Sequence, residues 1–291
     1  MNHILENEDW SIKIKETGAE LSSVQSKADG REYIWQGNPA VWAGQAPILF
    51  PIVGRLKDDQ YRTEGQTYHM RQHGFARRRN FNVLEQDKKR LKFGLTADQE
   101  SMAQYPYNFV LDITYELQDN KLQVTYEVTN KDQRDMPFSI GAHPAFSTPR
   151  IVDQQMQEYL LVFEKPETLD RHYIENGLVS GERERVLDNE KKLALHPKIF
   201  ERDALIFKNP QSDSVSLLSQ SDGKKLVEMH FEGFPYLGIW QKVGADYICI
   251  EPWYGLHDEE GFAGELQDKE GIQILRPEQT FSCSYVMRFF A

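Results

Sequence analysis

Two short segments of the chain carry side chains that can move protons. His143 lies directly before Pro144, and Glu251 lies directly before Pro252, each in an apolar, strand-like segment. An imidazole and a carboxylate held in place can act as general acid and general base on one small substrate. The two residues therefore predict acid–base chemistry if their strands meet.

Each of these two residues also has a structural explanation. A lone histidine among apolar neighbours is more often a satisfied core residue than a catalyst. Pro144 restricts His143 to an extended backbone, and Gly141 permits a bend or bulge just before it. Glu251 ends the apolar strand 247–250, where a carboxylate costs free energy unless it is paired or solvated. A structural ion pair therefore stays open beside a catalytic role.

Arg55 follows an apolar run that contains Pro47 and Pro51. Proline is tolerated only at the edge or end of a sheet, so the run predicts that Arg55 is delivered to a sheet rim. Its guanidinium can donate several hydrogen bonds to ligand hydroxyls or to a phosphate. A surface arginine after a buried strand explains it equally well. Asp203 precedes another apolar strand and is either a binding residue or a cap.

The segment 71–79 concentrates positive charge, with four arginines in nine residues of an acidic protein. Gly74 permits a ligand or another backbone to approach His73 closely. The last two arginines of the segment fit a solvated charge run. His73 and Arg77 flank Gly-Phe-Ala and are candidates for ligand binding.

The elements that must position these residues are predicted to be strands. Apolar residues alternate over 109–117 and again over 122–128, with a turn between, which predicts a β-hairpin. The same period of two recurs over 281–289. Helical signals are few and short, at 97–105, 38–43 and 197–202.

The chain is therefore predicted to be all-β, with a sandwich or barrel-like architecture and few short helices. No glycine-, serine- or proline-rich linker divides it, so residues 1–291 are expected to form a single domain. The glutamate-rich stretch 165–192 is the one shift in composition, and it predicts an excursion from the sheet.

Composition limits the classes of partner. The formal charge of −11 argues against nucleic acid or an anionic membrane surface as the main partner. The first residues are polar, and no apolar run approaches about 18 residues, so a cytoplasmic protein without a signal peptide is expected. Cys249 and Cys283 lie in apolar strand patterns and are predicted to be buried free thiols. No metal site is expected, because Gly74 argues against the helix that would bring His69 and His73 onto one ion.

Four segments, in chain order and over most of the chain, resemble the aldose 1-epimerases, also called galactose mutarotases. The closer match is to the compact bacterial LacX-like branch of that family. The resemblance implies a β-supersandwich fold and a cofactor-independent isomerase that interconverts the α- and β-anomers of a sugar. The segments are Pro-Ile-Leu-Phe-Pro-Ile-Val-Gly-Arg at 47–55, His-Gly-Phe-Ala-Arg at 73–77, His-Pro-Ala-Phe at 143–146 and Cys-Ile-Glu-Pro at 249–252.

The resemblance implies a role for each matching residue. His143 matches the family's general acid and Glu251 its general base, and nearby carboxylates are expected to keep His143 protonated. Arg55 and His73 match residues that bind sugar hydroxyls, and Asp203 matches a substrate-binding aspartate. Classical galactose mutarotases continue with Thr-Gln after the base and have His-Gly-Gly at the second segment. This chain has Pro-Trp-Tyr-Gly and His-Gly-Phe-Ala-Arg there, which leaves the identity of the sugar open.

Two alternatives stay open at this point. A hexose-6-phosphate 1-epimerase shares the mechanism and would use Arg55, Arg77 and Arg78 to clamp a phosphate. A carbohydrate-binding or sugar-sensing protein would use the scaffold without catalysis, although the presence of both His143 and Glu251 favours an enzyme. The expected partner is a small sugar or sugar phosphate, and the chain is expected to be a monomer or a homodimer. Four aromatic residues are candidates to stack on the sugar, although core packing is the better explanation for any one of them: Phe146, Trp240, Trp253 and Tyr254.

Overall fold

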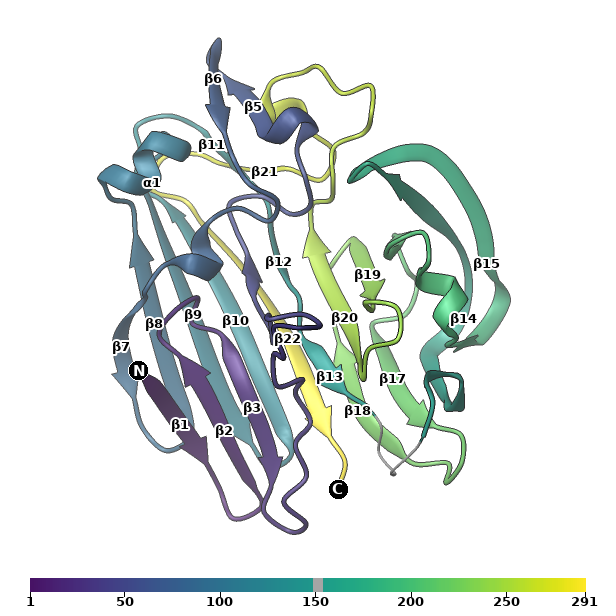
Figure 1. The fold of residues 1–291 in the computed structure, drawn as a ribbon. Helices are drawn as coiled ribbons and strands as arrows, with labels where there is room; N and C mark the ends of the chain where they lie inside the picture. The colour runs from purple at the N-terminus through teal and green to yellow at the C-terminus, as the bar shows by residue number, and fades with distance from the viewer. Residues whose placement is uncertain (149–153) are drawn as a thin grey trace.

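A computed structural model describes residues 1–148 and 154–291, and they form a protein built almost entirely from antiparallel strands (Figure 1). Within these residues, fifteen strands belong to one large sheet. Thirteen of them follow each other side by side in the order β4 (Ile48–Leu49), β12 (Ile140–Ala142), β20 (Tyr247–Tyr254), β19 (Tyr236–Trp240), β16 (Leu205–Lys208), β14 (Tyr159–Glu175), β17 (Ser214–Ser219), β18 (Lys225–His230), β22 (Thr280–Phe289), β10 (Lys121–Asn130), β9 (Phe109–Gln118), β8 (Arg90–Thr96) and β7 (Asn82–Gln86).

Two further strands branch from this path, and three smaller sheets complete the fold. The branches are β13 (Ala145–Ser147) on β20 and β15 (Leu178–Ala194) on β14. The smaller sheets are β1 (Asn2–Glu6), β2 (Trp10–Lys15) and β3 (Leu21–Ser26); β5 (Gln60–Thr63) and β6 (Gln66–His69); and β11 (Met136–Phe138) and β21 (Gln273–Leu275). The short helices are α1 (Gln99–Gln104) and the 3₁₀ turns η1 (Lys57–Asp59), η2 (Ala76–Arg78), η3 (Met156–Glu158), η4 (Pro197–Phe200) and η5 (Leu266–Asp268).

The main core lies between the three-stranded sheet and the large sheet, which makes the fold the predicted all-β sandwich. In Figure 1 the strands β1–β3 lie over β8–β10. Leu5 and Ile12 share one buried cluster with Phe93 and Val124, and the Trp10 and Phe289 rings have centroids 5.7 Å apart. Because apolar residues alternate along each strand, one face of each sheet is buried against the other.

The predicted hairpin is confirmed as β9 and β10. Leu122 lies opposite Leu117, and Val128 lies opposite Leu111, so the predicted apolar residues share one buried face. The predicted helix at 97–105 is α1, whose first turn is capped by the Asp98 side chain. The two other helical signals give the turn at 38–43 and the 3₁₀ turn η4.

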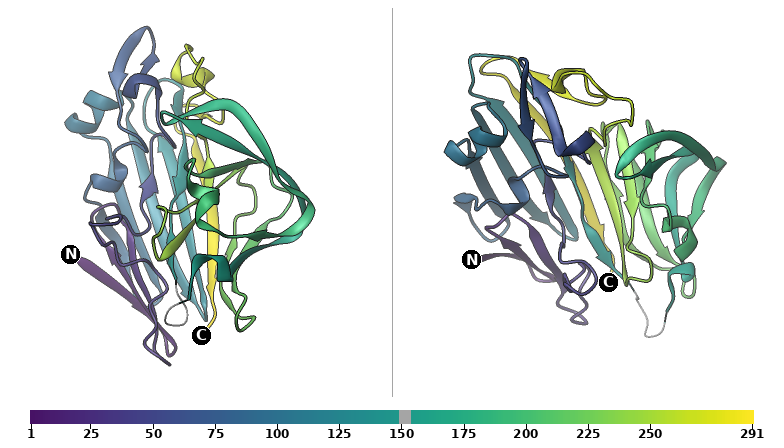
Figure 2. Two further views of the ribbon diagram at one scale, coloured as in Figure 1. Left: turned by 45° about the vertical axis from the view of Figure 1, so that its right-hand side comes forward. Right: turned by 45° about the horizontal axis from the view of Figure 1, so that its top comes forward.

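The glutamate-rich stretch 165–192 leaves the body of the sheet as a long hairpin of β14 and β15, as Figure 2 shows. Its first strand pairs with β17 only over Tyr159–Phe163 and touches β16 only at His172. Most residues of β15 are exposed, since this strand lies off the main path. Because these exposed positions hold polar residues, the sequence of this segment shows no apolar alternation that would predict a strand.

Both cysteines are free and buried, as predicted. None of the helices within the described ranges is long and apolar enough to cross a membrane.

Candidate active site

Strand β20 carries two sets of side chains that face opposite ways. Ile248 and Ile250 belong to the main core, whereas Cys249 and Trp253 pack into separate clusters on the other face. Glu251 follows the odd-numbered residues by the period of two and therefore points away from the core. Glu251 is thus not part of the main core, and its carboxylate lies on the opposite face of the sheet.

The register of β20 brings His143 directly opposite Glu251. Gly141 in β12 faces Trp253, and Ala145 in β13 faces Cys249. The two pairings belong to one continuous antiparallel register, and His143 occupies the position between them. Opposite residues of an antiparallel pair project from the same face, so the two candidate residues meet. Their strands, about a hundred residues apart in the sequence, are neighbours in the sheet.

Gly141 serves this arrangement through packing and not through a bend. A Cβ at this position would lie 2.7 Å from Cδ1 of Trp253. A Cβ at Gly238, on the other neighbouring strand, would lie 2.5 Å from the same indole. The strand pairing at Gly141 is regular, so the bulge that a glycine permits is not present here, and the glycine is required because the Trp253 ring lies over it.

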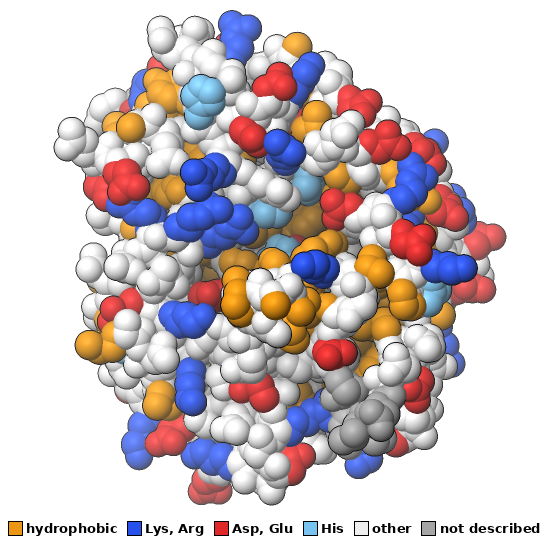
Figure 3. Space-filling view, viewed as in Figure 1, with side chains coloured by type: hydrophobic (Ala, Val, Ile, Leu, Met, Phe, Trp, Pro, Cys, Tyr) orange, Lys and Arg blue, Asp and Glu red, His pale blue; other side chains and the backbone are white. Residues whose placement is uncertain are grey.

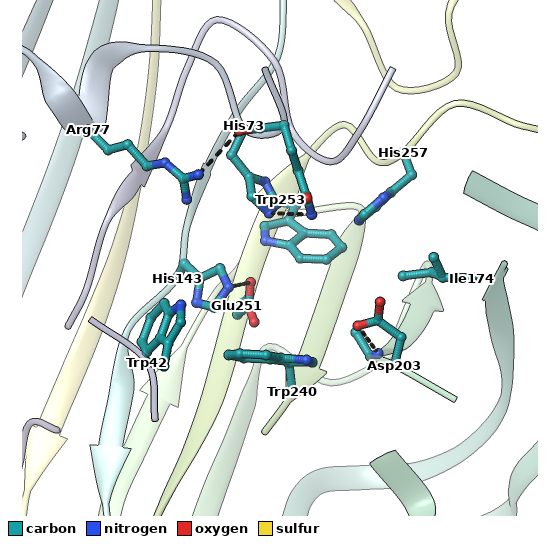
Figure 4. A pocket seen from close by; sticks show the side chains of 12 residues that line it. Trp42, His73, Arg77, His143, Ile174, Asp203, Trp240, Glu251, Trp253 and His257 are labelled. Carbon is teal, nitrogen blue, oxygen red and sulfur yellow. Dashed lines mark hydrogen bonds and ion pairs between the residues drawn. The ribbon is translucent and has the colours of Figure 1, made fainter. Parts of the chain in front are cut away.

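His143 and Glu251 are in direct contact but are otherwise unsatisfied. Nε2 of His143 lies 3.3 Å from Oε2 of Glu251, and the Glu251 side chain is only 1% exposed (Figure 4). Among the described residues, no side chain meets hydrogen-bond geometry with either Glu251 oxygen or with Nδ1 of His143, although the Trp253 side chain is near enough to act on Glu251 and to lower its pKa slightly against the effect of burial. The Trp42 ring stacks on the His143 ring with centroids 5.0 Å apart, and the Trp240 ring meets it edge-on at 5.6 Å. Because buried polar groups are normally paired, this pair costs stability and calls for a functional explanation.

Burial controls the protonation of the pair. It lowers the pKa of His143 to about 3, with a smaller contribution from the positive charge of Arg77. Burial also raises the pKa of Glu251 well above its usual range, and the Asp203 carboxylate adds to this effect. The expectation that carboxylates keep His143 protonated is therefore wrong for this structure, because desolvation disfavours both charges. Burial therefore disfavours the protonated imidazole of His143 and the ionised carboxylate of Glu251.

His73 lies in the turn after β6, with a left-handed backbone conformation (φ 64°) that is uncommon for a residue other than glycine. Its Nδ1 lies 3.0 Å from the N–H of Gly54, which donates to it, so neutral His73 carries its proton on Nε2. A Cβ at Gly74 would lie 2.2 Å from the carbonyl oxygen of Phe50. The close approach predicted at Gly74 is therefore that of the Phe50 backbone.

His257, in the loop after β20, is a site residue that the sequence analysis missed. Its ring is buried, 6.0 Å from the His73 ring, and its Nδ1 lies 2.8 Å from the carbonyl oxygen of Gly177. Burial lowers the pKa of His257 to about 4. His257 lies six residues after Glu251 in the sequence, and this proximity to a candidate catalytic residue is the signal that could have indicated it.

These residues line a cavity of about 330 Å³, near the small end of ligand pockets and of a size that suits a monosaccharide. Figure 3 shows the hollow on this face, with histidines at its base and lysine and arginine side chains along one side. Of the four proposed stacking residues, Trp240 and Trp253 line the cavity, whereas Phe146 belongs to the main core and Tyr254 packs against it. The lining residues are Trp42, Gln72, His73, Arg77, His143, Ile174, Asp203, Ala204, Trp240, Glu251, Trp253 and His257.

Arg77 and Asp203 bring opposite charges to the cavity. Burial lowers the pKa of Arg77 to about 10, and its Nη2 donates to the carbonyl oxygen of Gln72 at 3.3 Å. No carboxylate of the described residues forms an ion pair with Arg77. Asp203 has a left-handed backbone (φ 65°), and its Oδ1 accepts a hydrogen bond from the N–H of Ala204 at 2.8 Å. Asp203 therefore caps the turn before β16 while it lines the cavity.

Arg55 reaches the sheet rim, as its sequence context predicts, but its side chain does not line the cavity. Its Nε and Nη2 donate to the two carboxylate oxygens of Asp59 at 3.0 and 3.1 Å. The preceding Gly54 has a left-handed backbone (φ 77°), and the Arg55 side chain is 41% exposed. The contact of Arg55 with a ligand stays a prediction, and in this structure the charge of Arg55 is paired by Asp59.

Comparison with known proteins gives a consistent assignment. Residues 2–268 match the family model described as aldose 1-epimerase. The chain is 34% identical to the plasmid-encoded protein LacX of Lactococcus lactis, over 97% of each chain. A galactose mutarotase related enzyme from Lactobacillus acidophilus has a similar structure, with a TM-score of 0.95, 33% identity and coverage of 100% of this chain and 98% of that one. A galactose mutarotase-like protein from Lactobacillus casei gives a TM-score of 0.94, 32% identity and full coverage of both chains.

Proposed function

This chain belongs to the aldose 1-epimerase family, and from that premise we propose that it interconverts the α- and β-anomers of a hexose by acid–base catalysis. One observation carries the proposal: the buried, otherwise unpaired contact between His143 and Glu251 in a cavity of monosaccharide size. A structural ion pair would be expected to satisfy its oxygens, and this pair does not.

The geometry of the pair suits the reaction. In the sugar ring, the hydroxyl oxygen at C1 and the ring oxygen are bonded to the same carbon. An acid and a base that serve these two atoms must therefore lie next to each other, and the 3.3 Å between Nε2 and Oε2 meets that requirement. Glu251 removes the proton of the C1 hydroxyl while His143 protonates the ring oxygen, and the ring opens to the aldehyde.

Rotation about the C1–C2 bond then exposes the other face of the carbonyl, and the ring closes with the two roles reversed. One proton shared by the pair is sufficient for both steps. Because burial disfavours the protonated form of His143, we propose that the polar hydroxyls of a bound sugar stabilise the charged form of the pair. His73, Asp203 and Arg77 lie around the same cavity and are the proposed partners of the other hydroxyls.

A second candidate substrate is a hexose 6-phosphate, and Arg77 favours it. An arginine that lines a cavity without a carboxylate partner in residues 1–148 and 154–291 is available to a phosphate. Arg78 follows it, exposed to solvent, in the same 3₁₀ turn η2. A sugar-binding protein without catalysis is less well supported, since binding alone does not require a buried, unpaired acid and base.

The test is polarimetry or anomer-resolved NMR on freshly dissolved α-glucose, α-galactose and glucose 6-phosphate. The wild type is expected to speed equilibration, and His143→Ala and Glu251→Gln each to lose about 10²–10⁴-fold. If no sugar equilibrates faster with the wild type than with these variants, the protein is not an epimerase. If only the phosphorylated sugar responds and Arg77→Ala abolishes the response, the substrate is a hexose phosphate. The cytoplasm remains the proposed location, and a monomer or a homodimer the proposed assembly.

A further inference from the structure

We propose that Cys249, His143 and Glu251 form a binding site for a thiophilic divalent metal such as Zn²⁺, which competes with the sugar. The competition rests on the proposed function, whereas metal binding does not. The spacing of histidines in the sequence gave no sign of this group. The strand register assembles it, because Cys249 and Glu251 share one face of β20 and His143 lies opposite Glu251.

The distances suit a tetrahedral ion. One ligand atom from each of the three residues can be chosen so that all lie within 4.8 Å of one another. Two nitrogen or oxygen ligands at about 2.1 Å from a tetrahedral Zn²⁺ are themselves roughly 3.4 Å apart. The 3.3 Å between Nε2 of His143 and Oε2 of Glu251 already has this value. The sulfur of Cys249 lies within 4.8 Å of the ligand atoms chosen from His143 and Glu251, so it must move closer to them to complete three ligands.

The ligand atoms are also available. Within the described parts of the chain, neither carboxylate oxygen of Glu251 has a hydrogen-bond partner by geometry, and Nε2 of His143 contacts Oε2 of Glu251, the other proposed ligand atom. All three side chains are more than nine-tenths buried. An ion would therefore satisfy buried polar groups that the protein leaves unsatisfied.

The types of ligand select the ion. Thiolate, imidazole and carboxylate together favour Zn²⁺ over Mg²⁺ or Ca²⁺, which prefer oxygen ligands. Three protein ligands leave a fourth position, on the cavity side, for water. Burial raises the pKa of the Cys249 thiol, so the metal must displace the thiol proton, and one proton is released for each ion bound through sulfur. Arg77 lines the same cavity, and its positive charge opposes a dication.

Occupation of this site would stop the proposed reaction. Coordination consumes the lone pair of His143 and the carboxylate of Glu251, which are the groups that exchange protons with the sugar. A metal bound here is consequently an inhibitor and not a cofactor.

Titration of the reduced protein with Co²⁺ tests the binding directly, since a Co²⁺–thiolate bond gives a charge-transfer absorption that does not depend on any sugar. One Co²⁺ per chain is expected, and Zn²⁺ should displace it. Cys249→Ser should remove the charge-transfer band and weaken binding by at least the roughly 10–100-fold typical of lost supporting groups. Cys283→Ser is the matched control, since Cys283 is also a buried free thiol but lies on β22, and this variant should bind as the wild type does.

If Cys249→Ser folds poorly, Co²⁺ binding by two other variants and the inhibition of the wild type by Zn²⁺ test the same site. Glu251→Gln should also weaken Co²⁺ binding while it retains the charge-transfer band, and Arg77→Gln should tighten binding. In the epimerase assay, Zn²⁺ should raise the apparent KM of the wild type and leave kcat unchanged. The metal site is ruled out if the band is missing from the wild type or survives in Cys249→Ser. Metal binding that activates the enzyme, or leaves its rate unchanged, overturns the competition and not the site; failure of every sugar to react counts against the proposed function alone.

Discussion

Two buried pairs of ionisable side chains, Lys269 with Asp258 and His143 with Glu251, differ in how fully their polar atoms are hydrogen-bonded. In the first pair, Nζ of Lys269 donates to Oδ1 of Asp258 at 2.6 Å, and the N–H of Lys57 donates to Oδ2 at 2.9 Å. In the second pair, His143 and Glu251 are 3.3 Å apart and are otherwise unpaired in the described structure. Both pairs are more than nine-tenths buried.

The difference separates a structural pair from the pair that we propose to be reactive. Burial lowers the pKa of Lys269 and raises that of Glu251, so desolvation costs free energy at both sites. At Asp258 this cost is offset by hydrogen bonds to both oxygens, which tie the loop after β20 to residues 55–57 and so hold His257 in the cavity wall. At Glu251 the cost is left for a ligand to offset. Burial of a charge does not by itself mark a functional site, whereas a buried acid and base that lie together in a cavity without other partners make a candidate for one.

The largest effect is expected from breaking the structural pair. Lys269→Met leaves the Asp258 carboxylate buried without its cation and should lower the free energy of unfolding by about 3–5 kcal/mol. The double variant Lys269→Met/Asp258→Asn should recover most of this loss, because asparagine is neutral and still accepts from the N–H of Lys57. Urea unfolding measures both variants. If the single variant is as stable as the wild type, the two pairs do not differ in the way described.

The opposite sign is expected at the reactive pair. Glu251→Gln should stabilise the fold by about 1–3 kcal/mol at pH 7, because it removes a buried carboxyl whose ionisation has no compensation. The folded pKa of Glu251 is raised above its ordinary value near 4.5, so its cost appears as the pH rises above that value. The advantage of Glu251→Gln should thus vanish below about pH 4.5 in urea unfolding. A variant that is less stable than the wild type at pH 7 would contradict this account.

The free energy of unfolding should fall as the pH is lowered, partly because of His257, whose pKa is lowered from 6.5 to about 4 in the folded protein. As the pH falls through 6.5, the unfolded chain takes up a proton there and the folded protein does not. The wild type should lose about 1 kcal/mol between pH 6.5 and 5.5 from this residue alone. His257→Asn should lose less over the same interval, as followed by chemical unfolding at each pH. Equal slopes would show that His257 is not held neutral by the loop.

The smallest effect is expected at Arg55, which the family resemblance places on the sugar and the structure places on Asp59. Arg55→Ala should leave KM and the unfolding midpoint close to those of the wild type, because the ion pair is exposed and the side chain does not line the cavity. Arg77→Ala is the matched comparison, because Arg77 lies in the cavity wall and should raise KM. A large rise in KM for Arg55→Ala would show that Arg55 turns towards the sugar on binding.

Local patterns in the sequence were enough to predict much of the fold. Alternation over 109–128 predicted the hairpin of β9 and β10, because a half-buried strand repeats its environment every second residue. The same reasoning failed to show 165–192 as strands, since most of β15 is exposed and β14 buries polar residues there, such as Glu167 and Arg171, so neither strand has alternating apolar residues. His143 and Glu251 were predicted as a pair, and the register of β20 brings them into contact.

For other residues at or near the site, the direction of the side chain could not be predicted from local sequence patterns. Arg55 follows a turn at Gly54 that sends its side chain to Asp59, and no local pattern predicts that rotation. The sequence around Trp42 predicts only a short turn, although the Trp42 ring stacks on His143. His257 follows the end of β20, whereas Glu251 lies within that strand, and only the loop after β20 brings His257 to the cavity.

The sequence by itself determined the strand character of the chain, its family and the kind of chemistry that His143 and Glu251 can perform. These properties depend on residue type and on short-range spacing, which the chain carries in any conformation. Only the tertiary structure decided that Arg77 lines the cavity, that Arg55 does not, and that Cys249 lies within ligand distance of the reactive pair. Those outcomes depend on strand register and on the paths of turns, which are fixed by the packing of segments far apart in the sequence.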